Sequence, residues 1–163
     1  DLLFDAKHGI SPAPCLFFVC VGFYCLVKPN HALLHQVLKV PPPHKSKLAV
    51  GGSPNSCANP SLNAFGIEGR RTPDGVRFQL YIGGTWGRTT RMGSAFPRLV
   101  DKEEILPLLE KTMLWFRENA YQKERLGAAI DRIGEDALFA ALESNDLLDR
   151  KDEVLAAPLL QKP

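Results

Sequence analysis

The chain has 163 residues, of which 45% are hydrophobic and 23% are charged. This length allows one domain with a proper core or two very small ones, and the composition is that of an ordinary soluble globular protein. Twenty basic residues against eighteen acidic ones leave a net charge of +2, which is too balanced to favour nucleic acid or an anionic membrane as the main partner.

An uncharged apolar run covers residues 13–27 (APCLFFVCVGFYCLV). A membrane-spanning helix needs about 20 apolar residues, so this run is more typical of a buried segment or of a signal-peptide core. A signal peptide needs a basic segment before the run, whereas Asp1 and Asp5 precede this one with only Lys7. We expect a buried segment of a cytoplasmic protein, with a secretory signal as the alternative.

The next part of the chain is rich in turns. Apolar residues at four helically spaced positions predict a short helix over 31–40, which the three prolines at 41–43 end. A short strand is expected over 47–50. The glycines, prolines and asparagines that follow predict a turn-rich segment from 51 to 75.

A strand and several helices are predicted for the second half of the chain. The alternating sequence VRFQLYI at 76–82 predicts a half-buried strand, and a loop rich in glycine and arginine follows over 83–98. Asp101 is a suitable N-cap for a long helix with Glu103 and Glu104 in its first turn.

Three further helical segments make up the C-terminal third. One carries an apolar stripe from Leu126 to Ile133 and ends at Gly134, and short helices are expected over 137–142 and 147–155. The sequence therefore predicts a single α+β domain over residues 1–163, a helix-flanked mixed sheet with a helical C-terminal third.

All four cysteines, Cys15, Cys20, Cys25 and Cys57, lie in the first third of the chain. In a secreted protein this even number would allow two disulfides. In a cytoplasmic protein such clustering is typical of metal or iron–sulfur ligation. The 106 residues after Cys57 contain no cysteine, which argues against a disulfide framework distributed over the fold.

Two segments, CVGFYC at 20–25 and GGSPNSCA at 51–58, resemble the paired cysteine motifs of the nitrite/sulfite reductase family. That family has Cys-x5-Cys followed by Gly-Cys-Pro-Asn-x-Cys. The resemblance covers residues 19–157 and leaves 1–18 poorly matched. It continues through residues 65–71, the strand at 76–82, the Gly83-Gly84-x-x-Gly87-Arg88 loop, the helix ending at Asn119 and the stretch 124–134.

The resemblance implies a domain that binds a [4Fe–4S] cluster and sirohaem and passes electrons from the cluster to the sirohaem. Nitrite or sulfite would be the anion reduced. Cys20, Cys25 and Cys57 would be cluster ligands, with Cys57 also bridging to the sirohaem iron. Ser53 stands where the family places its third cysteine.

Two departures from the family pattern identify the chain as a partial or degenerate copy. A serine hydroxyl at Ser53 is a harder and far less acidic ligand than a thiol and should hold iron poorly. The pair Cys20 and Cys25 is separated by four residues instead of five. Cys15 is a possible fourth ligand, although a small apolar core residue is its other interpretation.

Sirohaem carries many carboxylates, which favours a role for arginines in binding it. A loop with Arg88, Arg91 and Arg98, plus the nearby Arg70 and Arg71, would supply planar donors suited to bidentate carboxylate pairing. The alternative interpretation is a solvated arginine patch on the surface.

The resemblance assigns no catalytic residue to this chain. In the family, cations on the distal side of the haem come largely from a preceding ferredoxin-like half, and only about eighteen residues precede the first matched feature here. We therefore expect a missing half or second subunit and an electron-donor protein or domain as partners, and no activity of this chain alone. The alternative function is a cofactor-free remnant acting as a structural or interaction module.

Overall fold

The computed structural model describes residues 39–52, 55 and 58–162. These residues form a mixed four-stranded sheet in the order β1-β2-β3-β4, in which β1 is parallel to β2 and the other pairs are antiparallel. In chain order the elements are β1 (Leu48–Gly51), η1 (Pro60–Leu62), β2 (Phe65–Thr72), β3 (Gly75–Ile82), β4 (Ser94–Ala95), α3 (Lys102–Asn119), α4 (Leu126–Ile133), α5 (Glu135–Glu143), α6 (Asp146–Asp149) and α7 (Lys151–Ala156).

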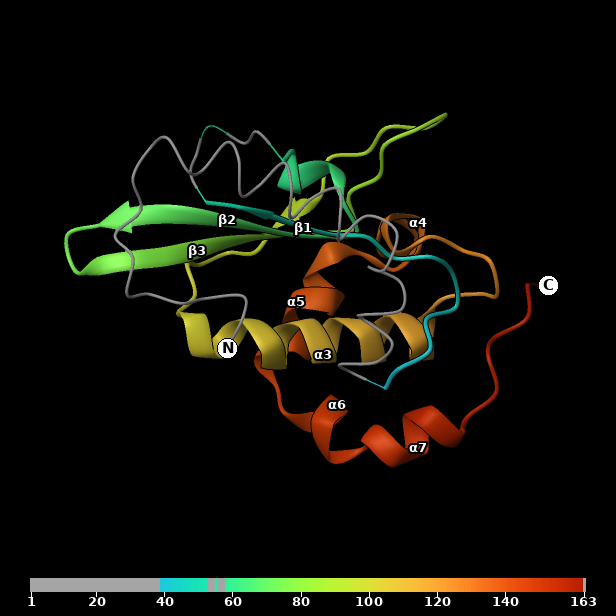
Figure 1. Cartoon of the computed structure of the whole chain (residues 1–163). Helices are drawn as coiled ribbons and strands as arrows, with labels where there is room; N and C mark the ends of the chain where they lie inside the picture. The colour runs from blue at the N-terminus through green and yellow to red at the C-terminus, as the bar shows by residue number, and fades with distance from the viewer. Residues whose placement is uncertain (1–38, 53–54, 56–57, 163) are drawn as a thin grey trace.

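The core lies between the sheet and α3, which crosses beneath the sheet in Figure 1. Alternate residues of β2 and β3 face this core, as the period of a strand requires. The core contains buried side chains of β2 and β3 and of the apolar face of α3. They include Phe65, Ile67, Leu80, Ile82, Ile105, Leu109, Met113 and Phe116. The helices α4 and α5 extend this layer, and α6 and α7 lie on the far side of α3 (Figure 1). The α+β fold with a helical C-terminal third is confirmed.

The prediction of a turn-rich segment up to residue 75 is wrong over 65–72, where β2 lies inside the sheet. The glycines that suggested turns are sites of close backbone approach. A Cβ at Gly66 would lie 2.1 Å from the Pro60 carbonyl oxygen, and one at Gly69 would lie 2.9 Å from that of Gly52. Tertiary packing therefore requires glycine inside this strand.

Most other predicted elements are confirmed within a few residues. The strands at 47–50 and 76–82 are β1 and β3, and the helix after Asp101 is α3. The helix expected over 147–155 is broken in two at Arg150, whose side chain binds Asp146. Of the helix expected over 31–40, only the last two residues are described, and neither is helical.

Arg117, near the end of α3, joins the two ends of the described chain. Its guanidinium donates to the carbonyl oxygens of Val154, Leu155 and Ala157 near the end of α7, at 3.0–3.2 Å. It also donates to the Pro41 carbonyl at 3.1 Å. A cation bound to the last carbonyls of a helix stabilises its C-terminus, so Arg117 holds both α7 and the segment that leads into β1.

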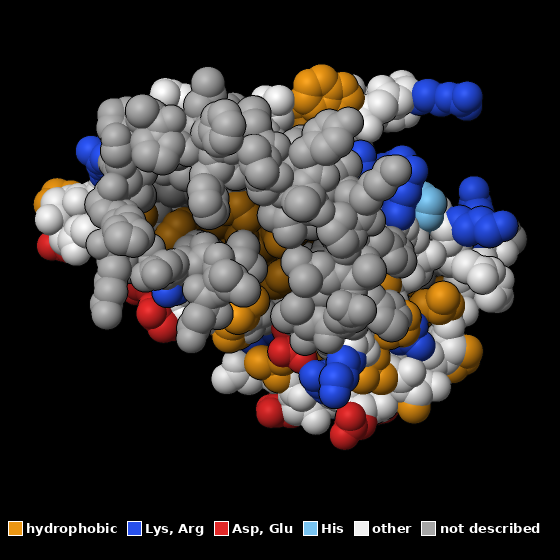
Figure 2. Space-filling model, viewed as in Figure 1, with side chains coloured by type: hydrophobic (Ala, Val, Ile, Leu, Met, Phe, Trp, Pro, Cys, Tyr) orange, Lys and Arg blue, Asp and Glu red, His pale blue; other side chains and the backbone are white. Residues whose placement is uncertain are grey.

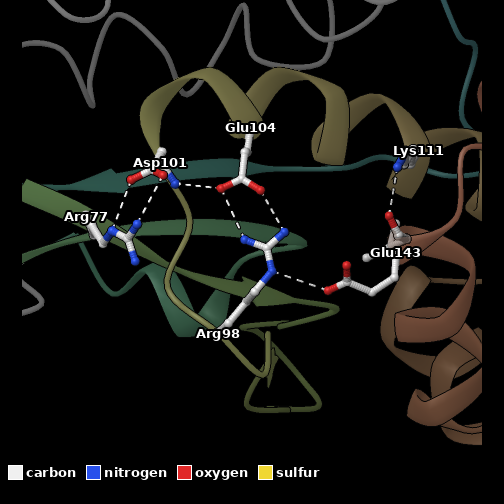
Figure 3. A network of polar contacts seen from close by, with 7 residues as sticks. Arg77, Arg98, Asp101, Glu104, Lys111 and Glu143 are labelled. Atoms are coloured by element: carbon white, nitrogen blue, oxygen red, sulfur yellow. Dashed lines mark hydrogen bonds and ion pairs between the residues drawn. The ribbon is translucent and has the colours of Figure 1, made fainter.

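An ion-pair network fixes the start of α3 against β3 and α5 (Figure 3). Arg98 donates to both carboxylate oxygens of Glu104 at 2.6 and 3.1 Å and lies 3.4 Å from Glu143. Arg77 pairs with Asp101 at 3.0 Å, and the Asp101 backbone N–H donates to Glu104 at 2.9 Å. This last contact is the capping-box arrangement that stabilises a helix N-terminus.

The network makes stability depend on pH. The hydrogen bonds from Arg98 and from the Asp101 N–H lower the pKa of Glu104 in the folded chain. A lowered folded pKa gives stability that is present above the unfolded pKa and is lost as the pH falls through the folded pKa. Because the Arg98 and Glu104 side chains are 44% and 36% exposed, Glu104→Gln should cost at most about 1 kcal/mol at neutral pH.

Urea unfolding of wild type and Glu104→Gln checks this prediction, with Glu103→Gln as the control on the same helix turn. The difference in the free energy of unfolding from wild type should shrink from neutral pH toward about pH 3, because the ion pair is lost as the pH falls through the lowered pKa of Glu104. An equal loss of stability in Glu104→Gln at neutral pH and at about pH 3 would contradict the prediction.

Within the part of the chain that the structure describes, no helix is long and apolar enough to cross a membrane. The apolar run at 13–27 lies outside the described residues.

Candidate functional site

The segment that carries Ser53 and Cys57 is fixed against β2 at both of its ends. Gly52 directly follows the carboxyl end of β1 and lies beside Gly69. Pro60, after the motif, lies beside Gly66. Both approaches are too close for a side chain on β2. The proposed ligands themselves, Cys20, Cys25, Ser53 and Cys57, lie outside the described residues, as does Cys15.

An ion pair with a buried carboxylate lies on β2, with Glu68 between these two anchors and the part-exposed Arg70 just beyond them. The Glu68 side chain is only 4% exposed and pairs with Arg70 at 2.5 Å. Glu68 Oε1 is buried and has no well-aligned hydrogen bond from the described residues beyond this pair. A buried carboxylate needs such a cation. Arg70 is therefore already paired with Glu68 in this structure.

The predicted arginines form two groups instead of one. In the ladder of β2 and β3, Arg70 is opposite Arg77, whereas the loop with Arg88 and Arg91 begins after Ile82 at the other end. Five residues of strand span about 17 Å. The expectation that Arg70 and Arg71 lie near the loop arginines is therefore wrong, because at least five residues of strand separate them from the start of the loop.

Arg91 is bound within the protein through all five of its N–H donors. Nε and Nη2 donate to the Asp131 carboxylate at 2.8–3.0 Å. Nη1 donates to the carbonyls of Gly83 and Met92 at 3.2 and 3.0 Å, and Nη2 also reaches Ser94 Oγ at 3.3 Å. The role of Arg91 as a sirohaem ligand stays a prediction, and it would require Asp131 to be displaced.

Arg71 and Arg88 are exposed, and neither has an ion-pair partner among the described residues. Arg98, in contrast, is bound to Glu104 and Glu143 and lies 5.5 Å over the Phe96 ring. Of the loop arginines, Arg88 is thus the one whose guanidinium can meet a ligand without rearrangement.

A small open cleft lies beside the base of the loop that follows β3. Its lining includes Lys45 and Lys47 before β1, Trp86 of the loop and Arg125 at the N-cap of α4, with no acidic residue. We call it the cationic cleft. In Figure 2 lysine and arginine side chains gather at the upper right, around the projecting loop of Figure 1.

The cationic cleft also receives the N-terminus of α4. The first turn of this helix contains no acidic residue, and Arg125 makes no side-chain cap. Backbone N–H groups at such a helix end carry a partial positive charge that favours anions. Sequence reasoning missed these residues, although the Lys-x-Lys pattern at 45–47 places two cations on one side of an extended segment.

Elsewhere in the described ranges, no group of three or more histidine, cysteine, aspartate or glutamate side chains is placed to hold a metal ion. The described residues thus include the two anchors that flank the cysteine motif at 53–57 and the cationic cleft.

Comparison with known proteins decides the family. Residues 27–147 match the family model described as the nitrite and sulphite reductase 4Fe-4S domain. The chain belongs to this family. The prediction made from the cysteine motifs is confirmed at this level.

Several relatives are reductases that this chain matches over only part of their length. The chain is 34% identical over 92 residues to a nitrite reductase [NAD(P)H] of Bacillus subtilis, covering 56% of this chain and 11% of that protein. It is 27% identical over 100 residues to an assimilatory-type sulfite reductase of Nitratidesulfovibrio vulgaris, covering 61% of this chain and 44% of that protein. The chain thus spans less than half the length of either relative.

A solved structure shares the fold. The NirA protein of Mycobacterium tuberculosis superposes with a TM-score of 0.56 over 75% of this chain and 21% of that one, at 23% identity. This likeness supports the arrangement of sheet and helices described above.

Proposed function

We propose that this chain is the cluster- and sirohaem-binding part of a nitrite or sulfite reductase. The observation that carries the proposal is the match of residues 27–147 to a 4Fe-4S domain. It is supported by the close packing of Gly52 and Pro60, which flank the segment 53–57, against Gly69 and Gly66 of β2. Anchored flanks fix the positions at which a ligand loop begins and ends, which a precise ligand site requires.

Cys20, Cys25 and Cys57 would hold the cluster, with Ser53 at the position of a fourth ligand. Thiolates are the usual ligands of iron–sulfur clusters, and three of them leave one iron weakly held. The two cofactors would supply one-electron transfer and reduction of the bound anion. The chain would contribute Cys57 as the residue shared by cluster and sirohaem.

The cationic cleft would bind an anionic group. Lys45, Lys47 and Arg125 give three positive charges in a lining that contains no acidic residue, and the N-terminus of α4 adds its partial charge. A carboxylate of the sirohaem, nitrite and sulfite all have the chemistry that this cleft fits. Arg88 and Arg71, which are exposed, would pair with further carboxylates.

Other parts of the reductase would come from elsewhere. A ferredoxin-like half, in the same or another polypeptide, would complete the haem pocket, and an electron-donor protein or domain would reduce the cluster. The balanced charge of the chain fits a cytoplasmic enzyme without nucleic-acid or membrane partners.

Sirohaem titration of the chain tests the cofactor part of this proposal. Arg88→Gln should weaken sirohaem binding by roughly 1.5–3 kcal/mol if Arg88 pairs with a carboxylate. The fold should be unaffected, because exposed loop substitutions change stability by about 0.5 kcal/mol or less.

Arg88→Lys keeps the charge and should restore part of the affinity, and Arg98→Gln, at an arginine bound to Glu104, is the matched control. Equal sirohaem affinity of wild type and Arg88→Gln would show that Arg88 is only a surface residue.

A further inference from the structure

Two walls of the cationic cleft are joined behind it by one ion pair. One wall consists of Gly84, Thr85 and Trp86 of the loop, and the other of the first residues of α4. Arg91 closes the loop through mutual backbone hydrogen bonds with Thr85 at 2.9 and 3.0 Å. Its side chain then crosses to Asp131 on α4.

We propose that Arg91 and Asp131 are positioning residues that set the separation of these walls, so that Trp86 and Arg125 face the same bound anion. The inference deepens the proposed function, since it rests on an anion occupying the cationic cleft. Neither residue lines the cleft, so both act through the residues that do.

The contact between the walls leaves almost no free space. A Cβ at Gly127 of α4 would lie 2.2 Å from the Gly83 carbonyl oxygen and 2.7 Å from Arg91 Cδ. Gly127 and Asp131 are four residues apart and therefore share one face of the helix. The face of α4 that meets the loop backbone is thus the face that carries the carboxylate for Arg91.

The Arg91 side chain has the features of a structural connector. It is 19% exposed, while its partner Asp131 is 62% exposed. A bidentate arginine–carboxylate pair fixes both distance and orientation, and the bonds to Gly83, Met92 and Ser94 fix both strands at the base of the loop. Trp86, 61% exposed, directly follows Thr85, whose backbone is bonded to Arg91 at this base.

The variant Asp131→Asn distinguishes a positioning role of Arg91 from a ligand role, because the two roles predict opposite changes in the anion affinity. Removal of a negative charge near a cationic site would by itself tighten anion binding, by about twofold at a surface separation. A freed Arg91 guanidinium would tighten it further if Arg91 were a ligand. Loss of positioning instead weakens binding, by about tenfold or more, because misplaced groups no longer converge on the ligand.

The experiment is a sulfite titration of the ¹⁵N-labelled full chain, followed through the indole Nε1–H signal of Trp86. Trp86→Phe assigns this signal against that of the buried Trp115. Hydrogen exchange of the Thr85 and Arg91 amides reports separately on the loop. Asp131→Asn and Arg91→Gln should both weaken sulfite binding about tenfold and speed this exchange, while Asp131→Glu should recover part of the affinity.

Equal or tighter sulfite binding by Asp131→Asn would overturn the inference, as would unchanged exchange of the two amides in that variant. If wild type binds no sulfite but sirohaem shifts the Trp86 signal, the anion is a sirohaem carboxylate, and the same comparison is made with sirohaem. If neither ligand binds wild type, the proposed function of the cleft is wrong, and the amide exchange alone decides whether the pair positions the loop.

Discussion

A chain carrying Ser53→Cys is expected to hold a nearly complete [4Fe–4S] cluster after anaerobic reconstitution, whereas the unmodified chain holds iron incompletely. A thiol ionises near neutral pH beside a metal and binds iron strongly, while a serine hydroxyl does neither. The substitution replaces one oxygen by one sulfur, so the chain between Gly52 and Pro60 should accommodate it. Iron and acid-labile sulfide per chain, together with the broad charge-transfer absorption, measure the effect.

Two further substitutions make this prediction specific. Ser56→Cys adds a thiol beside Cys57 but outside the family's ligand position, and it should leave the iron content unchanged. Cys15→Ser should also have no effect if Ser53 marks the missing ligand. If Cys15 already serves as the fourth ligand, Cys15→Ser abolishes the cluster and Ser53→Cys adds little.

A result in which neither the wild type nor Ser53→Cys binds iron would contradict the cluster assignment altogether. It would indicate that the shortened spacing between Cys20 and Cys25 prevents the cysteines from meeting one cluster.

Gly127→Ala should destabilise the fold and disrupt the cationic cleft, although alanine is the better helix former. Helix propensity alone favours alanine by about 1 kcal/mol. The added Cβ, however, would lie 2.2 Å from a backbone oxygen of Gly83, and backbone cannot move aside as a flexible side chain does. Overpacking of this kind typically costs about 1–3 kcal/mol, so the net change in the free energy of unfolding should be a loss.

Ala128→Gly, at the next and exposed position of α4, is the matched control for Gly127→Ala. It should cost about 1 kcal/mol through propensity and leave the Trp86 indole signal where it is in wild type. Urea unfolding and the Trp86 signal together check the prediction. A Gly127→Ala chain as stable as wild type, with an unshifted Trp86 signal, would show that α4 and the loop are not in close contact.

The sequence predicted those elements whose signals are local. The alternation in 76–82 identified β3, and the acidic residues after Asp101 identified the start of α3, where Glu104 does accept the Asp101 N–H. Gly134 ends α4 with a positive φ of 107°, as its position predicted. In each case the residues that determine the element lie within a few positions of it.

What sequence reasoning missed depends on distant contacts. Gly66 and Gly69 looked like turn residues because their reason, the approach of Pro60 and Gly52, is tertiary. Arg91 looked available for a ligand because its partner Asp131 is forty residues away. The cationic cleft combines Lys45, Trp86 and Arg125 from three separate segments, and no spacing rule links these segments in one sequence.

The most direct test of the central claim is the cofactor content of the unmodified chain after anaerobic reconstitution with iron, sulfide and sirohaem. The account predicts a coloured chain that retains sirohaem and several iron atoms through desalting, with somewhat fewer than the four of a complete cluster. A colourless chain that retains neither iron nor sirohaem, while unfolding cooperatively in urea, would contradict it and identify a cofactor-free copy of the fold.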